Sequence, residues 1–242
     1  MNSRKRRLIT AAVATAALVT VPAVPASASS HRPCGVAKHV TTSGVTKIGT
    51  ATATVGADGI KLTTARSSLT DKVSWQSTFR PVPANTVNEV SYETVKLDTT
   101  AGDNNVVNDA ALPAYHLYVR TPAGAGTLVF EPYYFMSKIG GGNPPRGLRT
   151  EWNVLDGPLW TPSTTIAGLP KTGGGPATLT FAQVVKANPK MTVTGIGFGL
   201  GTYNAGTTAV LDEQRFATTR DCTEHQWSTG FKTGHWFPGW VR

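Results

Sequence analysis

Alternation of apolar and polar residues along short segments is the feature that most constrains how this chain can fold. Residues 72–80 place Val73, Trp75 and Phe79 on one side of an extended chain and mostly polar or charged residues on the other. Because successive side chains of a strand point to opposite faces, this segment is expected to be a strand with one buried face. Similar segments recur in a chain with 25 Gly and 16 Pro, which favours short strands joined by turns over a helical bundle.

The same alternation predicts further strands, with Asp58-Gly59 as a hairpin turn between the first two. A capping box, Thr180 with Gln183, predicts one short helix over residues 181–187. We therefore predict an all-β fold, an antiparallel two-sheet sandwich of jelly-roll type with a single short helix. Besides 72–80, the predicted strands are residues 50–55, 59–65, 87–97, 114–121, 127–136, 149–155, 191–201 and 207–217.

Residues 1–28 have the parts of a secretory signal peptide. A positive start from Arg4 to Arg7 precedes an apolar run, and the small residues before Ala28 favour cleavage after it. The apolar run has about 14 residues, fewer than the roughly 20 that cross a bilayer, so a membrane anchor is not expected. We expect a secreted, extracellular protein with no transmembrane segment.

Charge argues against nucleic acid as a partner. The chain carries 23 Lys and Arg against 14 Asp and Glu, and four of the basic residues belong to the predicted leader. A mature chain would therefore have 19 basic residues and a net charge of about +5. These charges are scattered rather than clustered, whereas nucleic-acid binding proteins concentrate Lys and Arg on one surface.

Cys34 and Cys222 are the only cysteines, and they lie near the two ends of the mature chain. In an oxidising compartment such a pair favours a single disulfide bond, which requires that the two ends of the domain meet. No linker divides the body of the chain. The expected organisation is an N-terminal segment (29–45), a β-sandwich domain (46–222) and an aromatic-rich C-terminal tail (223–242), in a protein that acts as a monomer.

Five segments occur in an order that resembles a group of secreted actinobacterial β-sandwich proteins, most of which have no assigned function. The resemblance covers roughly residues 46–217 and implies a jelly-roll similar in shape to carbohydrate-binding modules and concanavalin-like lectins. In related sandwiches the last strand often reads Val-Asp-Asn, whereas this chain keeps Asp212 and continues with Glu213. The segments that carry the resemblance are 112–119, 127–133, 151–160, 181–189 and 195–201.

A sugar-binding face is the first functional hypothesis. Glycans are held by aromatic planes and polar groups, and alternation gathers both kinds of side chain on one side of several predicted strands. An ordinary solvated sheet face with cross-strand ion pairs explains the same pattern. The hypothesis is non-catalytic binding of an extracellular or cell-wall polysaccharide, with the ligand-binding residues His116, Tyr118, Arg120, Glu131, Tyr133, Glu151 and Trp160.

A carbohydrate-active hydrolase is the second hypothesis. A glycosidase needs two carboxylates about 5–5.5 Å or 6.5–9.5 Å apart across a cleft. Glu131 and Glu151 are the candidate pair. The sequence lacks the Glu-x-Asp-x-x-Glu arrangement of concanavalin-like glycanases. Binding without catalysis is therefore preferred to hydrolysis.

A structural calcium ion is an alternative to the expectation of no cofactor. Asp98, Asp103 and Asp109 lie within one Asx-rich segment and offer hard oxygen ligands. The segment has no EF-hand spacing, and Asx-rich loops usually serve turn geometry. No catalytic metal is expected.

The last residues of the chain are rich in aromatic rings, and they support a third hypothesis. Trp227, Trp236 and Trp240 belong to a segment whose Gly and Pro residues prevent a continuous helix. The segment either folds back and buries its rings or exposes them to a glycan, a lipid surface or a partner protein. The exposed case would make the chain a structural or interaction protein of the cell envelope.

Overall fold

The computed structural model describes residues 34, 38–99, 110–202 and 204–229, which belong to one compact unit within residues 32–242. The described part is an all-β sandwich, as the sequence predicts. Its elements are β1 (Lys38–His39), β2 (Thr46–Ile48), β3 (Thr52–Gly56), β4 (Gly59–Thr63), β5 (Lys72–Pro83), the 3₁₀ helix η1 (Ala84–Thr86), β6 (Val87–Thr99), β7 (Ala114–Thr121), β8 (Gly124–Phe130), α1 (Pro132–Lys138), β9 (Arg149–Asn153), β10 (Leu159–Trp160), α2 (Phe181–Ala187), β11 (Thr192–Gly201), β12 (Thr207–Thr218) and β13 (Cys222–Gln226).

Several sequence predictions concern residues outside this description. The signal peptide over residues 1–28 is one of them. Asp103 and Asp109, two of the three candidate calcium ligands, and the tail residues Trp236 and Trp240 also lie outside the described residues. They remain predictions.

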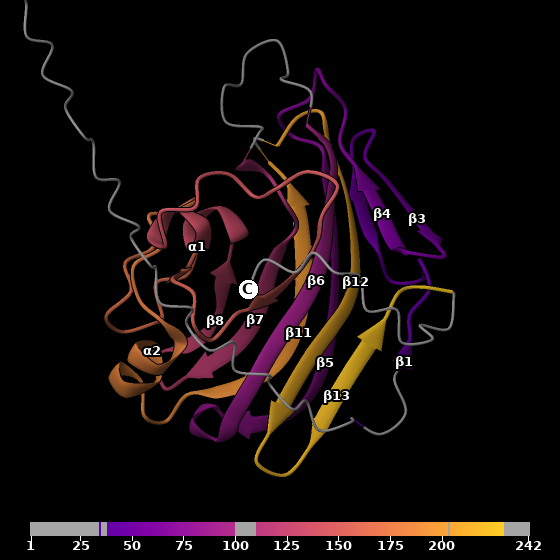
Figure 1. Cartoon of the computed structure of the whole chain (residues 1–242). Helices are drawn as coiled ribbons and strands as arrows, with labels where there is room; N and C mark the ends of the chain where they lie inside the picture. The colour runs from indigo at the N-terminus through magenta and orange to yellow at the C-terminus, as the bar shows by residue number, and fades with distance from the viewer. Residues whose placement is uncertain (1–33, 35–37, 100–109, 203, 230–242) are drawn as a thin grey trace, which may run out of the picture. The chain divides into compact units, whose positions relative to one another are not determined.

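The described strands form two sheets (Figure 1). In the seven-stranded sheet β12 is central, because it pairs with β6 along one edge and with β4 and β13 along successive parts of the other. The pairs β3–β4, β1–β13 and β6–β9 complete that sheet. The six-stranded sheet has the order β10-β8-β7-β11-β5-β2. Pairing between these strands is antiparallel except for β1 with β13.

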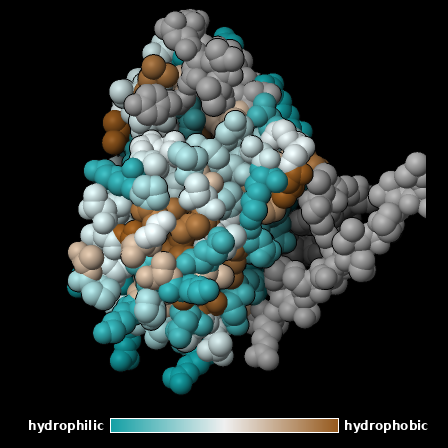
Figure 2. Space-filling view, turned by 90° about the vertical axis from the view of Figure 1, so that its left-hand side faces the viewer, coloured by the Kyte–Doolittle hydropathy of each residue, from teal (hydrophilic) through white to brown (hydrophobic). Residues whose placement is uncertain are grey.

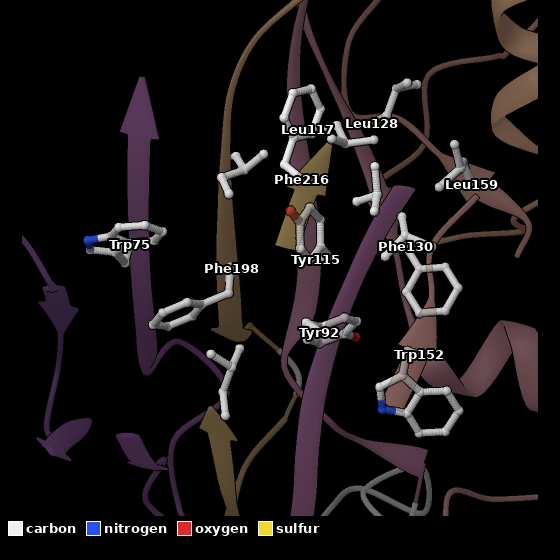
Figure 3. Packing of buried hydrophobic residues seen from close by; sticks show 14 of the residues in the cluster. Trp75, Tyr92, Tyr115, Leu117, Leu128, Phe130, Trp152, Leu159, Phe198 and Phe216 are labelled. Atoms are coloured by element: carbon white, nitrogen blue, oxygen red, sulfur yellow. The ribbon is translucent and has the colours of Figure 1, made fainter. Parts of the chain in front are cut away.

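Aromatic side chains from both sheets meet in the core (Figure 3). Tyr92 of β6 packs edge-on against Tyr115 of β7 and Phe130 of β8, with ring centroids 5.3 and 6.1 Å apart. The buried hydroxyl of Tyr92 donates to the carbonyl oxygen of Pro113 at 2.8 Å, so the ring carries no unpaired donor into the core. Alternating strand residues thus meet across the two layers, which is the burial that the sequence pattern predicts.

The predicted hairpin is present. β3 and β4 pair from Thr52 with Thr63 to Gly56 with Gly59, around a turn that contains Asp58. Gly59 has a φ of +127° and faces the backbone of β12, where a Cβ atom would lie 2.5 Å from the carbonyl oxygen of Leu211. Only glycine satisfies both conditions, which explains its place after Asp58.

The two α-helices differ in how well the sequence predicts them. α2 spans the predicted residues, and its capping box is formed by Thr180 and Gln183. α1 was not predicted, because residues 127–136 read as one strand. The strand β8 ends at Phe130, since Pro132 has no backbone N–H for the sheet and its fixed φ suits the first turn of a helix. Each helix has seven residues, and neither is long and apolar enough to cross a membrane.

The first and the last described strands, β1 and β13, pair with each other in the seven-stranded sheet. The predicted disulfide between Cys34 and Cys222 is present, with Cα atoms 5.1 Å apart. Beyond Cys222, β13 continues to Gln226 and pairs with both β12 and β1. The short strands β1, β2, β10 and β13 were not predicted, because they carry no apolar alternation.

Asp71 connects the two sheets through their loops. Its carboxylate accepts hydrogen bonds from the N–H and hydroxyl of Thr50, at 3.1 and 2.9 Å, and from the N–H of Ala65 at 3.0 Å. The hydroxyl of Ser68 donates to it at 2.6 Å. Burial alone would raise the pKa of Asp71, but the bonds from Ser68, Ala65 and Thr50 outweigh it and lower the pKa to about 2.

Loss of the disulfide should cost much of the stability. The bond closes a loop of 188 residues. Replacing both cysteines by alanine should lower the free energy of unfolding by about 5 kcal/mol, because the unfolded chain regains the entropy of the open loop. Urea unfolding measures the change. A reducing agent should destabilise the wild type and leave the double variant unaffected; a variant as stable as the wild type would contradict the prediction.

Asp71→Asn should destabilise the protein in a pH-dependent manner. A carboxyl whose pKa is lowered on folding stabilises the fold above its unfolded pKa, near 3.8, and that contribution disappears as the pH falls towards 2. The variant should lose about 2 kcal/mol at neutral pH, with the difference shrinking below pH 3.8. Urea unfolding at a series of pH values measures this, with Asp58→Asn at an exposed turn as the control of equal charge.

Candidate functional site

The outer face of the six-stranded sheet gathers polar and aromatic side chains in register. Across this sheet Trp160 pairs with Val129, Val129 with His116, His116 with Gly197, and Gly197 with Gln76. The inward neighbours of these residues, such as Phe130 and Leu117, are buried in the core, so the row itself faces outward.

The next row has the same character. Thr127 pairs with Tyr118, Tyr118 with Gly195, and Gly195 with Thr78. One pair further along β7 lies Arg120, which is exposed. We call the surface made by Gln76, Thr78, His116, Tyr118, Arg120, Thr127, Trp160 and the glycines of β11 the polar–aromatic face.

Strand β11 contributes no side chains to the middle of this face. Gly195, Gly197 and Gly199 occupy its outward positions. A Cβ atom at Gly199 would lie 2.7 Å from Cε1 of His116, and one at Gly197 would lie 3.2 Å from Cε2 of Tyr118. Both rings therefore extend from β7 over the glycine backbone, and β11 needs glycine there because any larger residue would displace them.

Three polar side chains of this face form no hydrogen bond within the described part of the fold. Among the described residues, the imidazole of His116, the hydroxyl of Tyr118 and the amide of Gln76 form no hydrogen bond, although each lies in a well-ordered sheet. Burial, and next Lys72, lowers the pKa of His116 to about 4, so the imidazole is neutral at physiological pH. Neutral rings with free polar atoms are the groups that a sugar ring and its hydroxyls contact.

Glu131 borders this face and is held by a tryptophan. Its backbone is extended, with φ −123° and ψ 129°, so its side chain continues the outward side of β8. The indole N–H of Trp160 donates to Oε1 of Glu131 at 2.8 Å. Burial raises the pKa of Glu131, and the bond from Trp160 opposes part of that rise. The pair fixes the plane of the Trp160 ring at the end of the row.

Two of the predicted ligand-binding residues lie elsewhere. Tyr133 is in α1 and not on a strand, because the chain leaves the sheet at Pro132. Glu151 is on β9 of the seven-stranded sheet, opposite Glu93 of β6, with Trp152 beside it in the core. The structure therefore does not bring Glu151 together with Glu131, since the two carboxylates belong to different sheets. The sequence shows which side of a strand a residue faces but not which sheet the strand joins.

The outer face of the seven-stranded sheet is a network of ion pairs. Arg149 contacts Glu93 at 3.1 Å and the buried Asp212 at 3.3 Å, and it donates to the carbonyl oxygen of Asp58. Oδ1 of Asp212 accepts the N–H of Ser228 at 3.1 Å, so both oxygens of this carboxylate have partners. Asp212 thus has a structural role in joining β12 to β9 and to the segment after β13.

Arg215 provides a second network on the same sheet. Its guanidinium lies 2.8 Å from Glu89 and 3.5 Å from both Glu213 and Glu224. These contacts connect β12 to β6 and β13. The acidic residues of this face therefore neutralise its arginines, and the face resembles the solvated, ion-paired sheet that was the alternative to a ligand site.

Trp227 is a core residue and not a surface contact. It is fully buried and packs edge-on against Trp75 and Phe198, with centroids 4.8 and 5.4 Å away. The hypothesis of an exposed aromatic tail is therefore wrong for Trp227, because β13 carries this residue back between the sheets.

The calcium site predicted from the sequence stays a prediction, because two of its three candidate ligands lie outside the described residues. The backbone of the third, Asp98, belongs to β6, which ends one residue later. Elsewhere, the described residues contain no group of three or more His, Cys, Asp or Glu side chains arranged to hold a metal ion.

A cavity of about 740 Å³ lies apart from the polar–aromatic face, beside β1 and β3. Two buried polar atoms at its wall, Nε1 of Trp227 and Oγ of Ser228, have no hydrogen-bond partner in the described structure. Hydroxyl and apolar groups dominate the lining, and it holds no carboxylate, so it offers no acid–base pair. The lining residues are His39, Val40, Thr41, Thr42, Ala53, Thr54, Val55, Trp227, Ser228 and Thr229.

The side of the unit that carries α1 and α2 has a different surface. Figure 2 shows apolar residues near the middle of this side, surrounded by polar ones. Ile139, just after α1, is 58% exposed. This surface has no register of rings and free polar groups comparable with the polar–aromatic face.

Comparison of the chain with models of known protein families, with curated proteins and with solved structures finds no match.

Sequence reasoning missed Gln76, Thr78 and the glycines of β11 as parts of the site. The signal was present in Gly195-Ile-Gly197-Phe-Gly199, where glycine alternates with large apolar residues. Such a strand has one buried face and one face without side chains, so it indicates that something approaches its backbone closely.

Two glycine substitutions should separate backbone from side-chain contacts on this face. A Cβ atom at Gly197 would lie 2.3 Å from the carbonyl oxygen of Trp75, so Gly197→Ala should destabilise by about 3 kcal/mol. At Gly199 the nearest atom belongs to the His116 ring, which can turn away, so Gly199→Ala should cost less than about 1 kcal/mol. Urea midpoints compare them; equal losses would show that β11 does not lie as described.

Proposed function

We propose that this protein is exported and binds an extracellular or cell-wall polysaccharide on the polar–aromatic face without cleaving it. The observation that carries the proposal is the row Trp160, Val129, His116, Gly197 and Gln76, which places two rings and free polar groups side by side on one sheet. Aromatic planes and unpaired hydrogen-bonding groups on one surface suit a chain of sugar rings.

The glycines of β11 support an extended ligand. Because they leave the centre of the sheet without side chains, the rings on β7 can lie low over the backbone. Val129, which faces outward between His116 and Trp160, is only 3% exposed. The rings of Trp160 on β10 and of His116 and Tyr118 on β7 thus flank an apolar residue of β8, and one row of side chains runs across three strands.

Binding is preferred to hydrolysis on geometric grounds. Glycoside hydrolysis requires two carboxylates on either side of one bond. Among the described strands of the six-stranded sheet, no outward position carries a carboxylate, and Glu131 stands at the edge of that face. Glu151, its proposed partner, belongs to the other sheet.

The disulfide bond and the absence of a membrane-spanning helix among the described residues are compatible with export. The proposal of export also rests on the resemblance to secreted actinobacterial proteins and on the leader pattern of residues 1–28. The sequence resemblance implies a shape like that of carbohydrate-binding modules, and it supports the proposed role only by analogy of fold.

Removing a ring from the face should weaken polysaccharide binding. The purified protein is tested for retention on cellulose, chitin, xylan and polygalacturonate by pull-down and affinity electrophoresis. His116→Ala and Trp160→Ala should each lower affinity for the retained polysaccharide about tenfold, because a stacking contact worth roughly 1.4 kcal/mol is lost.

Glu151→Gln is the matched control, because this residue lies on the other sheet and its substitution should leave retention unchanged. The proposal fails if none of the polysaccharides retains the protein, or if the ring variants bind as well as the wild type. Release of reducing ends that Glu131→Gln abolishes would instead favour a hydrolase.

A further inference from the structure

Three cations point outward from the six-stranded sheet. Lys72 and Arg80 lie at alternate positions of β5 with Gln76, and Arg120 lies on the outward side of β7 with His116. No outward strand position of this sheet carries an acidic residue in the described part of the chain. The polar–aromatic face is therefore positively charged.

These cations have no ionic partners in the part of the chain that the structure describes. Lys72, Arg80 and Arg120 form no ion pair with any residue that the structure describes. On the opposite sheet, by contrast, Arg149 contacts two carboxylates and Arg215 contacts three. The arginines of the seven-stranded sheet are thus neutralised by carboxylates. On the six-stranded sheet the positive charge remains available for a ligand.

The cations lie at both ends of the ring-bearing strip. Lys72 pairs with Gly201 at the last residue of β11. At the other end, Arg120 of β7 pairs with Thr192 of β11. Arg80 belongs to β5, the strand on the other side of β11, and lies near the register shift between Val193 and Gly195. The two arginines are thus separated by one strand, about 10 Å between backbones. An extended ligand lying across β11 can contact both.

The chemistry of these side chains selects an anion. Arginine presents a planar fork of N–H donors that matches the two oxygens of a carboxylate, sulfate or phosphate. His116 adds no further charge, because its imidazole is neutral, and it offers a ring and hydrogen-bonding nitrogens instead. Glu131 is held by Trp160 at the edge formed by β8 and β10, away from Arg80 on β5.

We infer that the polysaccharide bound on the polar–aromatic face is anionic, with charged groups contacted by Arg80, Arg120 and Lys72 while its sugar rings lie over His116, Tyr118 and Trp160. This inference rests on the proposed function and names the class of ligand for the same face. The shared chemistry is an acidic oxygen group, which a uronate carboxylate or a sugar sulfate can supply.

Matched pairs of polysaccharides test it. The probes are polygalacturonate with its methyl-esterified form, and dextran sulfate with dextran, so that each pair shares a backbone and differs in charge. Affinity electrophoresis and calorimetry at low salt should show at least tenfold tighter binding to the charged member of one pair or both. Binding should weaken steeply in 1 M NaCl, because salt screens exposed charges. Preference for one charged probe identifies carboxylate or sulfate as the ligand group.

Two double variants separate a specific site from general charge. Arg80→Gln with Arg120→Gln should lower affinity for the charged probe tenfold or more. Lys61→Gln with Lys186→Gln removes the same charge from exposed positions on β4 and α2 and should leave affinity unchanged. Circular dichroism and urea unfolding verify that both variants are folded.

The outcomes distinguish this inference from the proposed function. Equal binding to the charged and neutral members of each pair, with loss in His116→Ala, would overturn the anionic ligand and keep polysaccharide binding. Failure to bind any of the four probes, or cellulose, chitin and xylan, would overturn both. Equal loss in the two double variants, or equally tight binding to double-stranded DNA, would show unspecific attraction and overturn the inference.

Discussion

Burial of one face of each sheet against the other is the constraint on which the rest of this structure depends. Tyr92, Tyr115 and Phe130 meet edge-on between the layers, and Trp227 closes the core beside Trp75. Because strand residues alternate, every ring fixed inside determines which residue lies outside. The positions of the functional side chains are thus set by the packing of residues that never touch a ligand.

The sequence predicted what depends on near neighbours along the chain. It predicted the sandwich, the helix over residues 181–187 and the outward side of β7, since alternation and a capping box are local signals. The disulfide joins distant residues and was predictable because the chain has only two cysteines. It did not predict α1, which begins where Pro132 removes a ladder donor. Nor did it predict that Glu151 and Glu131 lie on different sheets, because strand pairing joins residues far apart in sequence.

The two outer faces use charge in opposite ways. On the seven-stranded sheet, Arg149 and Arg215 are surrounded by carboxylates that hold strands together. On the six-stranded sheet, the side chains of His116, Tyr118 and Gln76 form no hydrogen bond, and Arg80 and Arg120 have no acidic partner among the described residues. Identical strand geometry thus yields one face that contributes to the fold and another whose polar groups remain available, which is why the second is the candidate site.

The lengths of the outermost strands have a consequence for solubility. β10 and β2, at the two edges of the six-stranded sheet, have two and three residues, and β1, at one edge of the other sheet, has two. Strands so short expose few N–H and C=O groups of their own. The part of β5 that β2 does not cover carries Pro81 and Pro83, which have no backbone N–H, and both features disfavour the edge-to-edge stacking that seeds fibrils. At high concentration, a protein of this design would resist self-assembly along these margins and contact other molecules through its broad sheet faces.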